Sequence, residues 1–122
     1  MVARTAMLRI DNEGKVVWVN ARPVHLTPKE YRLLLLLSSQ LGRVFSREEI
    51  LEYVWPERDD VVDPASVKKY VYFLRRKLES DPSRPRLVLN VRGFGYKLNP
   101  EVCRVIIPSP KRSGSGLLLA GR

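Results

Sequence analysis

The apolar positions between residues 63 and 79 repeat with the period of an α-helix. The stripe consists of Val67, Val71, Leu74 and Leu78, whose spacing places them on one side of a helix. Asp63 can cap the first turn, and Pro64 fits the first helical position, where its missing N–H costs nothing. The pattern predicts a helix that packs on one side. The opposite side and its flanks carry basic and aromatic residues: Lys68, Lys69, Tyr72, Phe73, Arg75 and Arg76.

The charge on this helix has one sign. Between Ser66 and Leu78 the sequence has five basic residues, the last being Lys77, and no acidic one. Charged faces that only keep a helix soluble usually mix signs. Tyr72 and Phe73 also lower solubility without adding to the core. We therefore interpret this side as a surface for a polyanion, with a merely solvated face as the alternative.

Two further helices begin at capping boxes. Thr27 and Glu30 form a T-x-x-E box, and we expect the helix that it opens to run to about Leu41 before Gly42. We expect its buried face to consist of Tyr31, Leu34, Leu35 and Leu37. Ser46 and Glu49 form an S-x-x-E box for a helix that ends near Trp55, before Pro56.

Alternating apolar residues predict short strands on either side of the helices. Residues 6–10, 15–20 and 24–26 should form a small antiparallel sheet. Residues 86–91, with Leu87, Leu89 and Val91 on one face, and residues 96–98 should form a hairpin that turns at residues 92–95. A further strand can lie within residues 101–107. We therefore divide the chain into a leader (1–5), a domain (6–100) and an extension (101–122).

Composition narrows the class of protein. The chain has 122 residues, a formal net charge of +9 and a pI of about 10.1, which favours phosphates or another anionic surface as a partner. The single Cys103 cannot form an internal disulfide, which fits a reducing cytoplasm. We find no membrane span, no nucleophile–base pair, no metal-ligand cluster and no phosphate-binding loop. We therefore expect no catalytic activity, cofactor, metal or membrane association.

Four blocks of the sequence are informative together: LTPKEYRLLLLL, GRVFSREEILEYVW, the basic helix ending in LRRKLE, and DPSRPRLVLNVRGFGYKL. They resemble the DNA-binding effector domain of OmpR/PhoB-type response regulators. The resemblance covers roughly residues 7 to 99 of this sequence. It implies an α+β winged helix-turn-helix with an N-terminal antiparallel sheet, a three-helix core and a C-terminal β-hairpin wing.

The resemblance also implies roles for particular residues. Residues 66–77 would be the recognition helix in the major groove, Arg92 would reach from the wing into the minor groove, and Tyr96 would meet the DNA backbone or simply pack. The residues implied in DNA binding are Ser66, Lys68, Lys69, Tyr72, Phe73, Arg75, Arg76, Arg92 and Tyr96. Residues 57–62 lie where relatives contact RNA polymerase, so Glu57, Asp59 and Asp60 would form that contact, although an acidic loop can also be merely solvated.

The sequence also departs from the family pattern. Ala65 stands where many relatives have arginine, Phe73 where a polar or basic residue is common, and Lys68 where relatives are often acidic. The target DNA sequence therefore does not transfer from relatives. No receiver domain precedes the effector region, so we expect either a fragment of a larger regulator or a protein that works without phosphoryl control.

Two classes of function are compatible with these features. The first is sequence-specific double-stranded DNA binding by a bacterial, cytoplasmic transcription regulator of a two-component system, or by its output domain. The second is a winged helix repurposed as a protein-interaction module, motivated by the acidic loop and by Tyr72 and Phe73. The basic helix and Arg92 favour DNA. Without a receiver domain, we expect a monomer in solution that pairs only on DNA.

Overall fold

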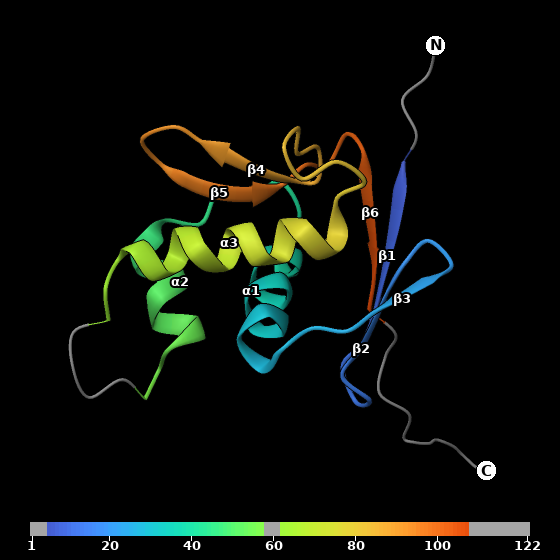
Figure 1. Ribbon diagram of the computed structural model, residues 1–122, viewed down its shortest axis with the longest axis horizontal. Coiled ribbons are helices and arrows are strands. Elements are labelled where there is room, and N and C mark those ends of the chain that lie inside the picture. The colour runs from blue at the N-terminus through green and yellow to red at the C-terminus, as the bar shows by residue number, and fades with distance from the viewer. Residues whose placement is uncertain (1–4, 58–61, 108–122) are drawn as a thin grey trace.

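The structure is a computed structural model that describes residues 5–57 and 62–107 (Figure 1). Within these ranges the chain forms three helices and six strands. In chain order they are β1 (Ala6–Asp11), β2 (Val16–Val19), β3 (Arg22–Val24), α1 (Pro28–Ser39), α2 (Arg47–Val54), α3 (Ala65–Leu78), β4 (Val88–Val91), β5 (Gly95–Leu98) and β6 (Cys103–Ile106). This order confirms the predicted winged helix-turn-helix. No helix in the described ranges combines the length and the apolar composition needed to cross a bilayer.

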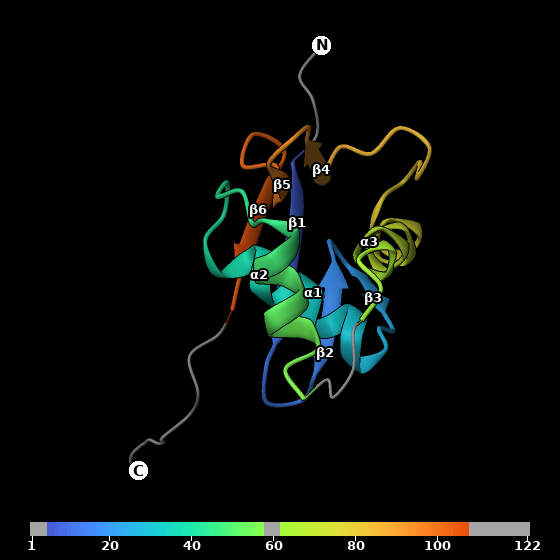
Figure 2. The same cartoon turned by 90° about the vertical axis from the view of Figure 1, so that its left-hand side faces the viewer.

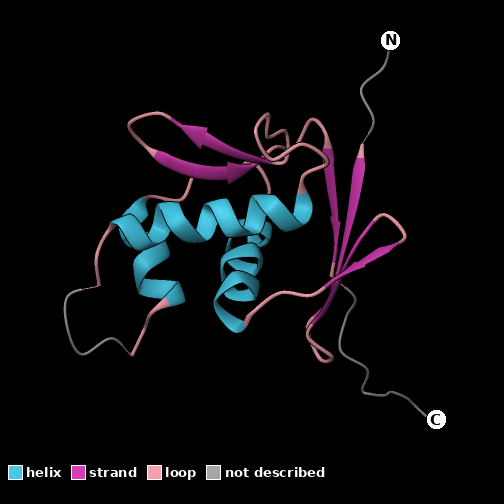
Figure 3. Ribbon diagram, viewed as in Figure 1, coloured by secondary structure: helices cyan, strands magenta, loops and turns pink. Residues whose placement is uncertain are grey.

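The strands before the helices form the expected antiparallel meander, and a later strand joins it. The sheet has the order β3-β2-β1-β6, with β6 parallel to β1. The strand considered possible within residues 101–107 is therefore present, and its Cys103 is fully buried against the core. Figure 3 shows this sheet standing at one end of the helical region, separate from the β4–β5 hairpin.

The third strand differs from the prediction. It covers Arg22–Val24 rather than residues 24–26, and Pro23 lies opposite Trp18 of β2. A proline can occupy this strand because β3 is an edge, where no neighbour requires its missing N–H. Leu26 instead lies in the segment that leads to the cap of α1.

Both predicted capping boxes are present. The Glu30 N–H donates to Thr27 Oγ1 at 3.3 Å, and the Thr27 N–H donates to Glu30 Oε1 at 3.0 Å. At α2 the Glu49 N–H donates to Ser46 Oγ at 3.1 Å, while the Ser46 N–H donates to Glu49 Oε1 at 2.8 Å. Each box satisfies N–H groups that have no partner inside the helix. These contacts explain why the starts of α1 and α2 could be predicted.

The helix ends and one buried face were predicted less well. α1 ends at Ser39 rather than near Leu41, because the backbone leaves the helical conformation at Gln40, with φ −142° and ψ 87°. Leu33, which was not expected in the core, is fully buried, whereas Leu35 is only half-buried.

The central helix packs as predicted. Val67, Val71, Leu74 and Leu78 are all buried in one core with residues of the sheet and the wing. Figure 2 views α3 nearly along its axis, with α1 and α2 to one side of it. One side of α3 therefore faces the core, and the opposite side is open to solvent.

Candidate nucleic-acid interface

The start of α3 is held by a carboxylate, close to where the sequence placed it. Asp63 Oδ1 accepts a hydrogen bond from the Ala65 N–H at 2.9 Å. Pro64 already has helical dihedrals, with φ −54° and ψ −24°, although α3 is bounded at Ala65. The expected contact of Asp63 with a free N–H is therefore present, and the boundary lies one residue later than expected.

The open side of α3 is basic and aromatic. Its exposed members are Lys68, Lys69, Tyr72 and Arg76, which we call the α3 outer face. The Tyr72 side chain is 53% exposed, and the Arg76 guanidinium lies 5.9 Å from the centre of its ring. Ser66, at the edge of this face, is half-buried. The outer face therefore presents positive charge beside an aromatic ring, a combination that suits phosphates and bases.

Phe73 lies beside the outer face and is held by other rings. It meets Tyr70 edge-to-face at 5.4 Å between ring centres, and Tyr70 meets Trp55 edge-to-face at 5.3 Å. This row connects α3 to the end of α2. Phe73 is half-buried, so its ring has a packing role that sequence reasoning did not identify. The prediction that it contacts DNA is not tested by this packing.

Not every basic residue of α3 is free. Lys77 Nζ lies 2.6 Å from Glu30 Oε1, and Glu30 is itself buried in the α1 capping box. Arg75 is half-buried, and its Nε donates to the carbonyl oxygen of Val88 in β4 at 3.0 Å. Arg75, predicted as a DNA contact, thus has a partner within the chain.

The wing turns tightly and presents two large exposed side chains. Residues 92–94 connect β4 to β5, and the Phe94 N–H donates to the Val91 carbonyl at 2.8 Å. Arg92 is exposed, as predicted, and Phe94 is 73% exposed. Sequence reasoning overlooked Phe94, although an aromatic residue between two glycines at a turn was the available signal.

The first wing strand is shorter than predicted. The prediction placed a strand over residues 86–91 with Leu87, Leu89 and Val91 on one face. Instead β4 starts at Val88, which is fully buried, while Leu89 and Val91, two residues apart in the strand, are half-buried. Leu87 is also buried but precedes the strand. The chain bends there because the N–H groups of residues 86–88 turn towards the Glu79 carboxylate.

Tyr96 joins the wing to the segment between α1 and α2. Its N–H donates to the Phe45 carbonyl at 3.0 Å, and the Phe45 N–H donates to the Tyr96 carbonyl at 2.8 Å. The Tyr96 side chain is half-buried and packs against the core. Of the two roles considered for this residue, packing is therefore observed.

The predicted polymerase-contact loop is described only in part. Glu57 is exposed, and Lys29 Nζ lies 3.8 Å from its Oε1. Asp59 and Asp60 lie outside the described residues. In the part of the chain that the structure describes, no three His, Cys, Asp or Glu side chains gather as a metal site would require.

Comparisons with known proteins agree with this geometry. The sequence profile described as "Transcriptional regulatory protein, C terminal" matches residues 21–98. A probable transcriptional regulator, ycf27 of Cyanidium caldarium, is 40% identical over 108 residues, which are 85% of this chain and 41% of the relative. This chain thus spans about two fifths of that curated relative.

Solved structures show the same fold. The response regulator DrrB of Thermotoga maritima, an OmpR/PhoB homologue, superposes with a TM-score of 0.67 at 36% identity, covering 74% of this chain and 40% of DrrB. The DNA-binding domain of the response regulator AdeR, solved in complex with an intercistronic region, has a TM-score of 0.65 at 29% identity and covers 75% of this chain and 93% of that domain. The profile match over most of the folded region, together with these likenesses, shows that the chain belongs to the transcriptional regulatory protein C-terminal family, the OmpR/PhoB-type DNA-binding domain.

Proposed function

We propose that this chain is the output domain of a transcription regulator and binds double-stranded DNA in a sequence-specific manner. In this proposal α3 enters the major groove and Arg92 of the wing reaches the neighbouring minor groove. The α3 outer face is the observation that carries the proposal, because it exposes Lys68, Lys69 and Arg76 without any acidic residue between Ser66 and Leu78. Such a helix contacts phosphates mostly and base edges at a few positions.

The aromatic residues of α3 now give weaker support to the alternative of a protein-interaction module. It relied on Tyr72 and Phe73 as unexplained aromatic residues of α3. Phe73 packs in the row with Tyr70 and Trp55, which explains it without a protein partner. Tyr72 remains exposed, but Arg76 lies beside its ring, and a paired cation and ring also suit nucleic acid.

Selection of bound duplexes from a random DNA pool tests the proposal. We expect the wild-type chain to enrich one motif. The Lys69→Gln and Arg76→Gln variants should recover the same motif with weaker enrichment, if these residues contact phosphates, or an altered motif, if they contact bases. The Lys15→Gln variant is the matched control, because Lys15 lies at the β1–β2 turn and donates to the carbonyl of Asn12. A wild-type chain that enriches no motif would contradict sequence-specific binding.

Contact with RNA polymerase is a separate part of the proposal. Glu57 is exposed three residues beyond the end of α2 and has only a loose ion pair with Lys29. A charge reversal, Glu57→Lys, should lower activation of transcription by purified polymerase while leaving DNA affinity unchanged. Equal activation by wild type and variant would remove Glu57 from that contact.

We also retain the prediction that the chain acts in the cytoplasm and is a monomer that pairs only on DNA. Sedimentation at micromolar concentration should give a monomer without DNA, and two chains on a duplex with two adjacent sites. A stable dimer without DNA would contradict this part of the proposal.

A further inference from the structure

Two side chains at the end of α3 bind both backbone polar groups of one wing residue. Glu79, which follows α3 directly, accepts from the Val88 N–H through Oε2 at 2.8 Å. Arg75, one helical turn earlier, donates from Nε to the Val88 carbonyl oxygen at 3.0 Å. Val88 is the first residue of β4 and is fully buried. We call this pair of side chains the α3–wing clamp.

The register of the wing explains why Val88 needs these partners. Val88 lies opposite Leu98 of β5, and the Asn99 N–H donates to the carbonyl of Leu87 at 2.8 Å. Positions in an antiparallel pair alternate, so the Val88–Leu98 pair is one that exchanges no hydrogen bonds. The N–H and C=O of Val88 therefore point away from β5. Buried backbone groups without partners are costly, and Arg75 and Glu79 satisfy both.

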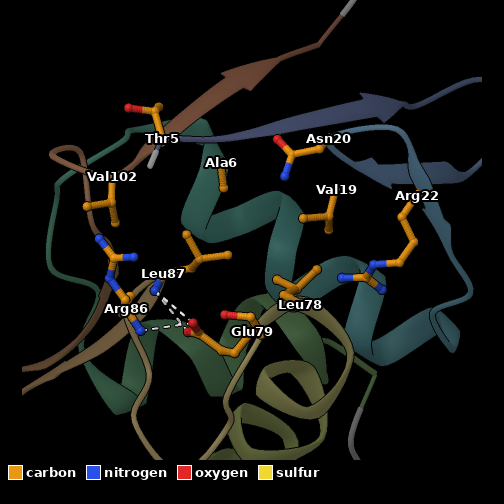
Figure 4. Close-up of a pocket in the computed structure, with 11 residues that line it drawn as sticks. Thr5, Ala6, Val19, Asn20, Arg22, Leu78, Glu79, Arg86, Leu87 and Val102 are labelled. Carbon is orange, nitrogen blue, oxygen red and sulfur yellow. Dashed lines mark hydrogen bonds between the residues drawn. The ribbon is translucent and has the colours of Figure 1, made fainter. Parts of the chain in front are cut away.

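Glu79 also fixes the residues before the strand. Its two oxygens accept from the N–H groups of Arg86, Leu87 and Val88 at distances between 2.8 and 3.1 Å. The Glu79 side chain is only 7% exposed, and a buried carboxylate is tolerated when several donors surround it. Figure 4 shows the Glu79 carboxylate directed towards the backbone nitrogens of Arg86 and Leu87, at the wall of a cavity that residues of β1 and β2 also line. Glu79, at the start of the connection between α3 and β4, therefore holds the end of the same connection.

The clamp holds the base of the wing, while the backbone hydrogen bonds between Phe45 and Tyr96 hold its second strand. Arg92 is four residues beyond Val88, so it lies about 13 Å along the strand at about 3.3 Å per residue. A small rotation at Val88 therefore displaces Arg92 by much more than it displaces the base of the hairpin. Two grooves can be contacted at once only if the helix and the wing tip keep a fixed separation.

We propose that Arg75 and Glu79 are positioning residues that couple the major-groove contact of α3 to the minor-groove contact of Arg92. The proposal rests on the proposed function and assigns Arg75 a role through the wing in place of the direct DNA contact implied by the family resemblance. Arg75 is half-buried and its Nε is engaged. The outer-face residues Lys69 and Arg76 supply direct phosphate contacts.

Three substitutions separate the hydrogen bond of Arg75 from its charge. In Arg75→Gln, the side-chain nitrogen is the same number of bonds from Cα as the arginine Nε, so a donor to Val88 is retained without charge. Arg75→Lys keeps the charge but places its nitrogen one atom further out. Arg75→Met keeps a chain of similar length and removes both. For each variant we would measure the affinity for the selected duplex and the preferred base at each position of the site. Both measurements are made below the melting temperature of the variant protein.

We expect DNA binding to depend on the hydrogen-bond donor at residue 75 and not on the charge there. Arg75→Gln should retain the flank preference due to the wing and lose little affinity. Arg75→Met should erase that preference while keeping the major-groove motif. In an Arg92→Ala background Arg75→Met should have no further effect, because its influence passes through the wing tip. Full affinity in Arg75→Lys with loss in Arg75→Gln, or additive losses with Arg92→Ala, would overturn the proposal in favour of a direct phosphate contact.

A measurement without DNA distinguishes failure of the clamp from failure of the proposed function. Amide hydrogen exchange at Val88 and Val91 should accelerate in Arg75→Met and in Glu79→Gln, and should stay near wild type in Arg75→Gln. The amides of Leu33 and Leu34 in α1 are the internal control and should be unaffected. Unchanged wing exchange in both disrupted variants would show that no clamp acts, whatever the chain binds. Accelerated exchange in a chain that enriches no DNA motif would refute the proposed function alone.

Discussion

Phe45 and Tyr96 exchange both of their backbone hydrogen bonds, at 2.8 and 3.0 Å, and so join the segment between α1 and α2 to the second strand of the wing. Gly95 lies against this contact. A Cβ atom at Gly95 would come within 2.0 Å of the Phe45 carbonyl oxygen, which is backbone and cannot move aside easily. The contact therefore requires glycine at this position, as does the φ of +146°.

Gly95→Ala should accordingly be among the most destabilising single substitutions in the wing. We expect a loss of about 2 kcal/mol or more in the free energy of unfolding, because strain and a clash act together. Gly93→Ala is the matched control. Gly93 has a φ of +85°, but a Cβ there would meet nothing within 4 Å, so only the backbone strain of about 1 kcal/mol applies. Urea denaturation measures both variants, and equal losses would show that the approach of Gly95 to Phe45 is not tight.

The reactivity of the Cys103 thiol should show whether β6 stays paired with β1. Burial, and next the charge of Glu79, raises the pKa of the Cys103 thiol to about 11 from an ordinary 9.0. The buried thiol should therefore react slowly with a disulfide reagent at pH 8 and rapidly once the chain is unfolded in urea. Reaction of the native protein at the rate of the unfolded chain would show that β6 does not protect the residue.

The same shift in pKa predicts a dependence of stability on alkaline pH. The folded state retains the thiol proton more strongly than the unfolded state, so this contribution is fully present below pH 9 and is lost as the pH rises from 9 towards 11. As the pH rises through this window, the free energy of unfolding of wild type should fall relative to that of Cys103→Val. A difference that is constant from pH 8 to pH 10.5 would contradict the raised pKa.

Arg92→Ala should change which DNA is preferred more than it changes the fold. Arg92 is exposed at the wing tip, and exposed residues of this kind usually contribute within about 0.5 kcal/mol to stability. In the minor groove an arginine responds mainly to A·T content and groove width. We expect the variant to bind more weakly and to lose preference at an A·T-rich flank, with an unchanged melting temperature. A selected motif that keeps its flank preference and its full affinity would remove the wing from the groove.

Phe94 provides the comparison for that experiment. Phe94 is exposed at the same turn as Arg92 but carries no charge. Phe94→Ala should therefore leave the salt dependence of DNA binding unchanged, whereas Arg92→Ala should reduce it.

Local signals were sufficient to predict the helices from the sequence. Thr27 with Glu30 and Ser46 with Glu49 lie three residues apart, so each capping box can be recognised without knowledge of the fold. The apolar stripe from Val67 to Leu78 likewise needs only the helical period. The same applies to the two-strand form of the wing, with glycines on both sides of Phe94.

Contacts between distant segments could not be predicted in this way. The family resemblance assigned Arg75 to DNA, and its hydrogen bond to Val88 could not be predicted, because Val88 is thirteen residues away and the direction of its carbonyl depends on the register of the wing. Phe73 looked like a free aromatic residue because its position beside Tyr70 depends on how α2 and α3 pack. The contacts of Glu79 with residues 86–88 were not predicted, for the same reason. In each case the missing information was the relative placement of two elements, which a periodic pattern does not contain.

The central claim is that the outer face of α3 binds DNA through phosphates, and the salt dependence of affinity tests it most directly. Affinity for the selected duplex should be measured from about 50 to 300 mM salt for wild type, Lys69→Gln, Arg76→Gln and Lys77→Gln. Each lost phosphate contact should flatten the slope of log K against log salt concentration by about 0.9. Lys77 belongs to the same helix but is paired with Glu30, so its variant should lose stability and keep the wild-type slope. Flatter slopes for Lys69→Gln and Arg76→Gln alone are the predicted result, and wild-type slopes for both would contradict the account.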